Sequence, residues 1–214
     1  MYSKLRFLTR SAKHKTLSSY ANLPKQAATV VPLCLNKAVP SILFMQRPVR
    51  EKDPYSGQIC FPGGKFDSKL DKTLVDTAVR ECHEEIGISE IDVWGPTPGI
   101  PDYSGTMCVT GFVGDIGDVN PDNLIVNNDE VAKTFTVPIE VLLDETSHKV
   151  KNYERFRKGK QIQVPMPVWS LPGIRTKLWG LTACQLNLAL HFLYGQEIYF
   201  HRLFPKGQDS SKDA

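Results

Sequence analysis

Apolar and polar residues alternate along this chain in a pattern that predicts a mixture of strands and helices. Short runs rich in β-branched and aliphatic residues, bounded by proline- and glycine-containing loops, are typical of strands. They occur at 27–35, 41–46, 91–94, 107–113 and 133–137, and a final hairpin is expected from 150–156 and 162–169 with its turn at 157–160. Pro32 lies inside the first run. Because proline removes one donor from a sheet ladder, we expect an edge strand or a bulge there.

The segment 73–86 has the spacing of an amphipathic helix. Its apolar residues recur every four positions, which at about 100° per residue forms one buried stripe. The stripe consists of Leu74, Ala78, Cys82 and Ile86. Gly87 follows directly, as a helix C-terminal cap does. We therefore expect a helix that ends at Ile86.

Two further helices complete the predicted elements. One is expected at 182–194, with Leu186, Leu190 and Leu193 on its buried side. A shorter one is expected at 138–143, where a proline occupies the first turn. Strands and helices in this order predict an α/β fold, with a mixed β-sheet sandwiched between helices (α/β/α).

Three carboxylates, those of Glu81, Glu84 and Glu85, fall within an arc of roughly 100° beside the apolar stripe, because residues three and four apart share a helix face. Like charges this close are most stable with a cation, and hard divalent ions such as Mg²⁺ take oxygen ligands of this kind. The alternative is a solvated acidic helix face. Arg80, directly before the first glutamate, and the glycine pair at 63–64, where backbone can approach a phosphate or metal, favour the metal site.

The stretch 80–88 (RECHEEIGI) resembles the second half of a Nudix box, whose pattern is a glycine, five residues, a glutamate, seven residues, then R-E-U-x-E-E-x-G-U, where U is apolar. The first half departs from this pattern. Fifteen residues separate Gly64 from Arg80, two more than in the pattern, and Lys72 stands at the glutamate position. Asp67 and Asp71 are the nearby acids that could substitute.

The resemblance implies the Nudix fold over about residues 27–195 and an Mg²⁺- or Mn²⁺-dependent hydrolase of nucleoside diphosphates linked to another group. The implied metal ligands are Glu81, Glu84 and Glu85. The implied catalytic residues are Glu84, Glu130 and Arg80, of which Arg80 orients the glutamates and Glu130 is a further ligand or the general base. For Glu130 the alternative is a solvated loop acid. Gly63 and Gly64 are implied to approach the substrate closely through their backbone.

The segment before these glycines bears on the substrate. Residues 43–47 (LFMQR), Gly57 and 61–64 (FPGG) together resemble the segment that marks coenzyme A pyrophosphatases within the Nudix superfamily. The later stretch 178–182 (LWGLT) resembles a helix start in the same group, particularly in its mitochondrial members. Arg47 matches the first of the arginines that are expected to hold the anionic 3′-phospho-ADP half, since an arginine fork suits phosphates.

The second arginine of that segment has no clear match. The position four before Gly57 is Asp53, and the nearby cations are Arg50 and Lys52. We take Arg50 as the second substrate-binding candidate. The identity of the substrate depends on this point.

These resemblances predict a diphosphatase that hydrolyses coenzyme A or its derivatives to 3′,5′-ADP and 4′-phosphopantetheine products. One alternative is a nucleotide-sanitising Nudix pyrophosphatase, with the same metals, that acts on (d)NTPs or other nucleoside diphosphate derivatives. Another is a Nudix-fold binding module of weak activity, which the presence of all three helix glutamates disfavours. We expect a small-molecule substrate as the partner and no nucleic acid, and a homodimer is left open.

Composition fits a soluble globular protein, with 41% apolar and 23% charged residues. No apolar run approaches the roughly 18 residues of a membrane span. Five scattered cysteines without a C-x-x-C pair disfavour both a disulfide scaffold and a zinc site, and they fit a reducing compartment.

Charge is distributed unevenly along the chain. Residues 1–50 contain nine Lys or Arg and no Asp or Glu. The segment 1–26 has the composition of a mitochondrial transit peptide, with a disordered basic tail or a nucleic-acid arm as alternatives. We therefore expect a Nudix hydrolase domain at 27–204, a flexible tail at 205–214 and a mitochondrial location. Peroxisomal and cytosolic locations are the alternatives, and the chain ends without a Ser-Lys-Leu peroxisomal signal.

Overall fold

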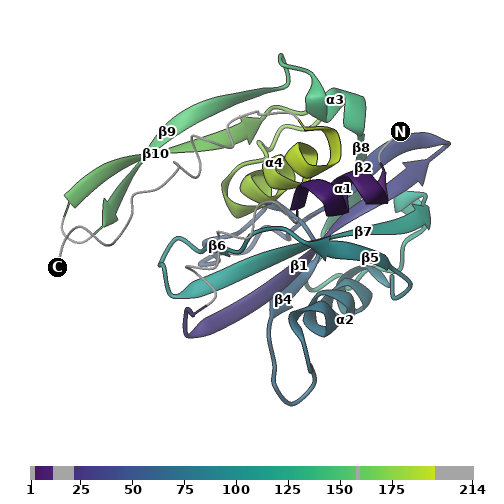
Figure 1. Cartoon of the computed structure of the whole chain (residues 1–214), viewed down its shortest axis with the longest axis horizontal. Coiled ribbons are helices and arrows are strands. Elements are labelled where there is room, and N and C mark those ends of the chain that lie inside the picture. The colour runs from purple at the N-terminus through teal and green to yellow at the C-terminus, as the bar shows by residue number, and fades with distance from the viewer. Residues whose placement is uncertain (1–2, 12–21, 158–159, 196–214) are drawn as a thin grey trace.

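A mixed eight-stranded β-sheet forms the centre of the fold (Figure 1). This computed structural model describes residues 3–11, 22–157 and 160–195. Strand β1 (Lys25–Asn36) runs parallel to β7 (Met107–Asp118) and antiparallel to β2 (Val39–Gln46). The other strands of this sheet are β3 (Ile59–Cys60), β4 (Gly63–Lys65), β5 (Asp92–Pro96), β6 (Ile100–Pro101) and β8 (Lys133–Pro138). The strands predicted for this part of the chain are confirmed, in most cases with longer bounds.

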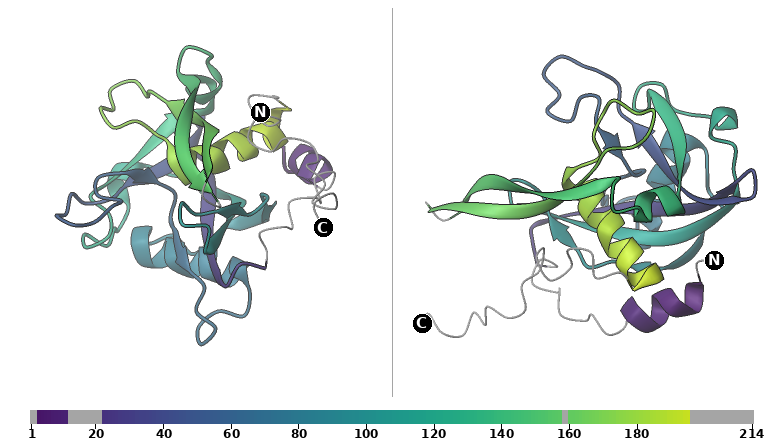
Figure 2. Two further views of the ribbon diagram at one scale, coloured as in Figure 1. Left: turned by 90° about the vertical axis from the view of Figure 1, so that its left-hand side faces the viewer. Right: turned by 90° about the horizontal axis from the view of Figure 1, so that it is seen from above.

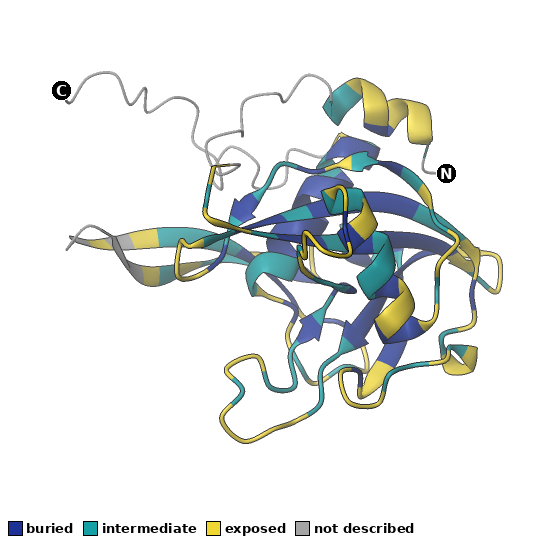
Figure 3. Cartoon of the chain, turned by 90° about the horizontal axis from the view of Figure 1, so that it is seen from below, coloured by how far each residue is buried: buried dark blue, intermediate teal, exposed yellow. Residues whose placement is uncertain are grey.

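Helices cover both faces of the sheet (Figure 2). They are α1 (Lys4–Ser11), α2 (Leu74–Ile86), α3 (Ile139–Leu143) and α4 (Gly180–Tyr194), with a 3₁₀ turn at Pro121–Asn123. Alternate side chains of a strand point to opposite faces. Ala28 and Val30 of β1 accordingly pack in the core with α2, whereas Val31 and Leu33 pack in the core with α4. Figure 3 shows the resulting buried sheet, and the predicted α/β/α layering is confirmed.

Pro32 does not lie on an edge strand, because β1 has β7 on one side and β4 and β2 on the other. Val30 N–H donates to Pro62 O (2.9 Å), and alternate amides of a strand point the same way. The missing donor of Pro32 therefore faces the point at which β1 changes partner from β4 to β2. The edge prediction was wrong, but the expected irregularity is present as a register shift with β7 between Leu33 and Leu35.

The expected hairpin consists of β9 (His148–Arg157) and β10 (Lys160–Trp169), which form a separate two-stranded sheet that projects from the body (Figure 2). Residues 158–159 of its predicted turn lie outside the described residues. At the base of the hairpin, Trp169 N–H donates to Leu178 O (2.9 Å) and Trp169 Nε1–H donates to Leu142 O (3.0 Å). These bonds join the base of the hairpin to the segments before α4 and at α3.

Helix α4 is buried on more sides than its leucine spacing predicts. Leu186, Leu190 and Leu193 are buried as expected, but so are Gln185 and Asn187. The reason is that α4 packs against β1, β6, β10 and α1 at once. Within the described residues, no helix is long and apolar enough to cross a membrane.

The basic N-terminal segment contributes helix α1 to the domain. Phe7 has no exposed surface and meets the ring of Phe192 edge-on, with centroids 5.8 Å apart, and that of Trp94 at 6.4 Å. Arg10 Nη1 donates to Phe192 O (3.3 Å) near the C-terminal end of α4, where a cation is favourable. Lys4 Nζ donates to Asp92 Oδ1 (2.5 Å). Residues 4–11 are therefore packed on the domain, while 12–21 lie outside the described residues.

Replacing Phe7 by leucine is expected to lower the free energy of unfolding by about 1.5 kcal/mol, because a smaller side chain fills the site poorly and the edge-to-face contact with Phe192 is lost. Urea unfolding followed by tryptophan fluorescence measures this. The control is Leu5→Ala on the same helix, where the side chain is 73% exposed and little change is expected. Equal stability of the Phe7 variant and the wild type would show that α1 does not dock in solution.

Candidate active site

Both ends of helix α2 are fixed by the caps that its sequence provides. Thr73 Oγ1 accepts a hydrogen bond from Asp76 N–H (3.3 Å), and the Asp76 carboxylate accepts one from Thr73 N–H (2.7 Å). This reciprocal pair is a capping box. At the other end Gly87 adopts φ 75° and its N–H donates to His83 O (2.9 Å). The predicted helix is confirmed, and its caps fix where it begins and ends.

Glu85 is the most deeply buried acid of the predicted cluster, with 3% of its surface exposed. Its Oε2 accepts a hydrogen bond from Gly63 N–H (2.8 Å). Burial, together with the charges of Glu81 and Glu130, raises the pKa of the Glu85 carboxyl to about 8, against the opposing effect of the Gly63 bond. A cation at this carboxylate would offset the cost of burying its charge.

Glu81 lies directly against the backbone of Gly64. A Cβ atom added to Gly64 would come within 2.4 Å of the Glu81 carboxyl carbon. Burial raises the pKa of Glu81, and its bond with Arg80 opposes this shift. The glycine pair thus lies against two of the three helix carboxylates: the Gly63 amide donates to Glu85, and the missing side chain of Gly64 leaves room for Glu81.

Arg80 is clamped between acids on both sides. Its Nε and Nη2 donate to the two oxygens of Asp71 (2.8 and 3.0 Å), and its Nη1 donates to Glu81 Oε1 (2.9 Å) and Glu84 Oε2 (3.1 Å). Asp71 is 4% exposed and also accepts from Thr77 Oγ1 (2.8 Å). The guanidinium therefore compensates several carboxylates, and its bond with Asp71 holds the pKa of Asp71 well below its usual range.

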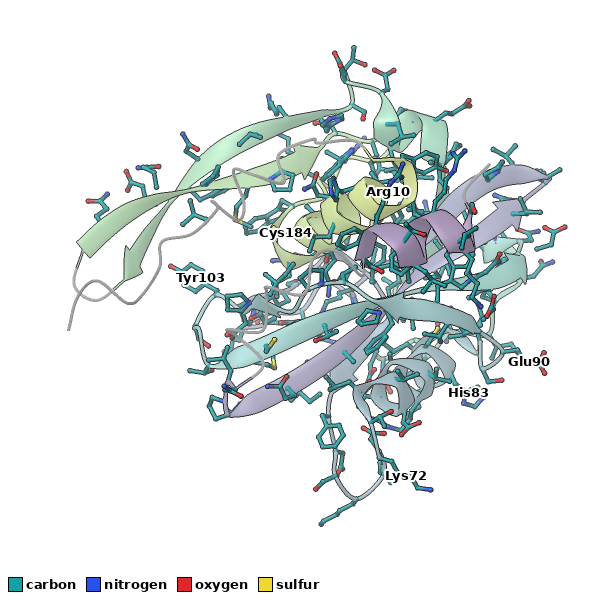
Figure 4. All side chains as sticks on the ribbon, in the orientation of Figure 1. Arg10, Lys72, His83, Glu90, Tyr103 and Cys184 are labelled. Atoms are coloured by element: carbon teal, nitrogen blue, oxygen red, sulfur yellow. The ribbon has the colours of Figure 1, made fainter. Side chains whose placement is uncertain are left out.

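The structure distinguishes between Asp67 and Asp71, the two acids near Lys72, which stands where the Nudix box has a glutamate. Asp71 contacts Arg80, whereas Asp67 accepts from Lys69 N–H (2.9 Å) in the preceding turn. Lys72, at the glutamate position of the pattern, is exposed and lies on the loop before α2 (Figure 4). The extra residues in the first half of the box thus form a turn that brings an aspartate to the arginine.

Glu130 comes to the site from a different segment of the chain. Asn127 N–H donates to Glu85 O (2.9 Å) at the end of α2, and Glu130 N–H donates to Asn127 O (2.9 Å). Glu130 is exposed, yet its charge raises the pKa values of both Glu81 and Glu85. Its charge therefore acts on both of these helix carboxyls.

The two predicted substrate-binding arginines lie on the loop between β2 and β3. Arg47 Nη2 donates to Asp53 Oδ2 (3.3 Å), and the charge of Arg47 acts to lower the pKa of Glu85. Arg50 reaches across to the carbonyl oxygen of Asp129, the residue before Glu130. Both arginines thus approach the segments that carry the acids.

Sequence reasoning missed two contacts around this loop. It noted Asp53 only as a departure from a pattern and gave no sign that its carboxylate pairs with Arg47. It also missed that Gln46 Nε2 donates to Gly57 O (3.0 Å) and to Thr176 Oγ1 (3.2 Å), which ties the loop to the segment before α4. The Gln46–Thr176 bond joins residues far apart in the sequence, and none of these contacts produces a periodic pattern along the chain.

Comparison with known proteins decides the family. Residues 24–157 match the family model of the NUDIX domain. The chain belongs to the Nudix family. It is 35% identical to the mitochondrial coenzyme A diphosphatase NUDT8 of Homo sapiens over 172 residues, 79% of this chain and 70% of that protein. It is 32% identical to the protein of the same name from Mus musculus over 181 residues, 84% of this chain and 83% of that protein.

Solved structures agree on the fold. A MutT/nudix family protein from Enterococcus faecalis matches with a TM-score of 0.54 and 17% identity, covering 94% of this chain and 75% of that chain. The predicted Nudix fold and family resemblance are confirmed, and the chain is a Nudix hydrolase.

The acids of this Nudix site suit a hard divalent ion by their chemistry. Glu81, Glu85 and Glu130 supply carboxylate oxygens, and the charge of Glu130 contributes to the raised pKa values of Glu81 and Glu85. Among the described residues, no three His, Cys, Asp or Glu side chains already form a closed ligand set. Arg80 and the Gly63 amide hold the three helix glutamates through hydrogen bonds, each to a single carboxylate oxygen.

Replacing Gly64 by alanine is expected to displace Glu81 without disturbing the fold, because the added methyl meets the end of a flexible side chain. Calorimetry should show Mg²⁺ affinity reduced about ten-fold, with the free energy of unfolding changed by less than about 1 kcal/mol. The matched variant Gly63→Ala should lose stability instead, since its methyl would lie 2.3 Å from Ala28 O at φ 152°. Unchanged Mg²⁺ affinity in Gly64→Ala would exclude Glu81 as a ligand.

Proposed function

We propose that this Nudix hydrolase is a diphosphatase of coenzyme A or its derivatives that requires Mg²⁺ or Mn²⁺ and releases 3′,5′-ADP and a 4′-phosphopantetheine product. The position of Arg47 carries the proposal. Arg47 belongs to the coenzyme A-type segment, by which we mean residues 43–64 with their resemblance to coenzyme A pyrophosphatases. Its charge acts on Glu85, the most buried of the proposed metal ligands. A cation suited to bind phosphate is therefore close enough to act on the charge of the most buried acid. The likeness to two coenzyme A diphosphatases supports the same substrate.

The proposed metal ligands are Glu81, Glu84 and Glu85. A divalent ion held there would offset the charge of the diphosphate and lower the pKa of a water molecule. Gly63 N–H keeps Glu85 in place through its 2.8 Å bond. Arg80 is proposed to orient Glu81 and Glu84, which it contacts now, and to compensate their charge before the ion arrives.

Hydrolysis requires the oxygen of water to bond to one phosphorus while the bridging P–O bond breaks. We propose that Glu130 accepts the proton from this water or completes the ligand set, because it is exposed and its charge acts on both Glu81 and Glu85. Arg47 and Arg50 are proposed to bind phosphate oxygens through charge-assisted hydrogen bonds. The two products then separate with one phosphate each from the original diphosphate.

A substrate panel tests this proposal. Purified protein is incubated with coenzyme A, acetyl-coenzyme A, and a set of nucleoside triphosphates and dinucleotides, each with and without Mg²⁺ or Mn²⁺. The expected result is metal-dependent release of 3′,5′-ADP from the coenzyme A compounds. Hydrolysis of the nucleotides but not of the coenzyme A compounds would favour the nucleotide-sanitising pyrophosphatase. No hydrolysis of any compound would favour a binding module.

We also propose a mitochondrial location, on the likeness to two proteins named as mitochondrial. Deleting the N-terminal segment is a poor test, because the deletion also removes the buried Phe7. A fluorescent protein that carries residues 1–26 at its N-terminus separates targeting from folding. Mitochondrial fluorescence supports the proposal, and a uniform cytosolic signal contradicts an N-terminal targeting segment.

A further inference from the structure

On the loop between β2 and β3, the acid Asp53 forms an ion pair with Arg47, one of the two proposed phosphate-binding arginines. Arg47 Nη2 donates to Asp53 Oδ2 at 3.3 Å. Asp53 stands four residues before Gly57, where the coenzyme A-type segment is expected to carry its second arginine. The chain thus has a negative charge in place of a positive one, and that charge is paired with the remaining arginine.

The Asp53 carboxylate is held in position mainly by the main chain. Its Oδ1 accepts a hydrogen bond from Tyr55 N–H (2.9 Å). This bond is the largest cause of the lowered pKa of Asp53, and Arg47 lowers the pKa further. The carboxylate is therefore charged at neutral pH, and the Tyr55 amide anchors it to the loop independently of Arg47.

Arg47 has an unused donor for a phosphate. Its Nε is buried and has no hydrogen-bond partner in the described part of the chain, while its side chain as a whole is 36% exposed. The contact with Asp53 is a single bond through Nη2, and it is long for an ion pair. A phosphate that bonded Nε and Nη2 together would form the fork-like contact that arginine favours, and it would have to displace Asp53.

The loop can release Asp53 from Arg47 without losing its shape. Gly57 N–H donates to Pro48 O (3.2 Å), and Arg50 N–H donates to Ser56 Oγ (2.8 Å). These bonds close the loop independently of the ion pair. Exchange of the carboxylate for a phosphate therefore breaks one partly buried contact and leaves these backbone bonds in place.

We propose that Asp53 is a specificity-determining residue that competes with a substrate phosphate for Arg47. The substrate named here rests on the proposed function, whereas the competition does not. Asp53 raises the KM of any substrate that places a phosphate on Arg47, and it leaves kcat unchanged because it is already displaced once the substrate is bound. That phosphate is either the 3′-phosphate of coenzyme A or part of its diphosphate.

The variant Asp53→Asn tests the competition, because asparagine retains an oxygen for Tyr55 N–H and loses the charge. The KM for coenzyme A is expected to fall about five-fold, with kcat unchanged. Dephospho-coenzyme A identifies the phosphate: an unchanged KM for it indicates the 3′-phosphate, and a parallel fall indicates the diphosphate. The control Asp144→Asn removes an acid that accepts from Thr146 N–H (2.8 Å) in the same kind of turn, and it should leave both constants unchanged.

An Arg47→Gln background shows whether Asp53 acts through the arginine. In that background Asp53→Asn should no longer lower KM. An equal fall in KM with and without Arg47 would overturn the proposal, because it would indicate direct repulsion between Asp53 and the substrate phosphate. If Asp53→Asn leaves KM unchanged while Arg47 is intact, the proposal is also overturned. If the wild type does not hydrolyse coenzyme A, the proposed function fails, and calorimetry with 3′,5′-ADP decides the competition alone. Tighter binding by Asp53→Asn supports the competition, and equal binding refutes it.

Discussion

Replacing Glu85 by glutamine is expected to lower metal-dependent kcat/KM more than about a hundred-fold while leaving the fold intact. Glutamine keeps an oxygen for Gly63 N–H but loses the charge that would bind the ion. Because burial raises the pKa of Glu85 to about 8, a neutral side chain is easier to bury there. The melting temperature without added metal should therefore stay the same or rise. Loss of activity without loss of stability separates a ligand from a structural residue.

The control for this prediction is Glu90→Gln, which neutralises an exposed acid shortly after α2 (Figure 4). It should retain wild-type activity and metal dependence. Full metal-dependent activity of the Glu85 variant would contradict the ligand assignment. A large fall in melting temperature would show instead that the carboxylate holds β4 to α2.

Replacing Asp71 by asparagine is expected to lower the free energy of unfolding by about 3 kcal/mol, because it leaves the largely buried Arg80 without its two-bonded partner. The freed guanidinium should also bind Glu81 and Glu84 more strongly, and we expect activity to fall about ten-fold with a higher Mg²⁺ requirement. Urea unfolding and a Mg²⁺ titration measure the two effects. Asp67→Asn is the matched control, since Asp67 accepts only a turn amide among its recorded side-chain bonds.

The Asp71 pair also predicts a pH dependence with a definite sign. Arg80 holds the pKa of Asp71 below its usual range, so the carboxylate is more easily ionised in the folded state than in the unfolded state. Its contribution to stability is complete above the unfolded pKa of about 3.9 and is lost as the pH falls towards the folded value. The stability difference between wild type and Asp71→Asn should stay constant from pH 7 to about pH 5 and shrink below about pH 4. A difference that grows on acidification would contradict the pairing.

Local signals were sufficient to predict helix α2 and the residue at which it ends. The apolar stripe, the acids beside it and Gly87 are all set within a few turns of chain, and the observed helix ends at Ile86 as predicted. The long helix α4 was placed correctly for the same reason, but its burial was not. Gln185 and Asn187 are covered because several elements meet there, and no spacing rule contains that information.

Contacts between distant segments were the part that the sequence did not predict. The place of Pro32 depends on which strands flank β1, and those strands come from three different segments. The docking of Phe7 depends on rings of β5 and α4 that lie far along the chain. At the site, the choice of Asp71 over Asp67 depends on the path of one turn. Patterns within one segment cannot distinguish these outcomes.

The position of β1 has a consequence for how the molecule opens. This strand is buried on both faces and has partners on both sides, so its amides should be among the last to exchange with deuterium. Gly63, which bonds Glu85, lies on β4 and pairs with Thr29 of β1. The anchor of the deepest acid is thus paired with the strand that we expect to open last, whereas Arg47 and Asp53 lie on the loop between β2 and β3.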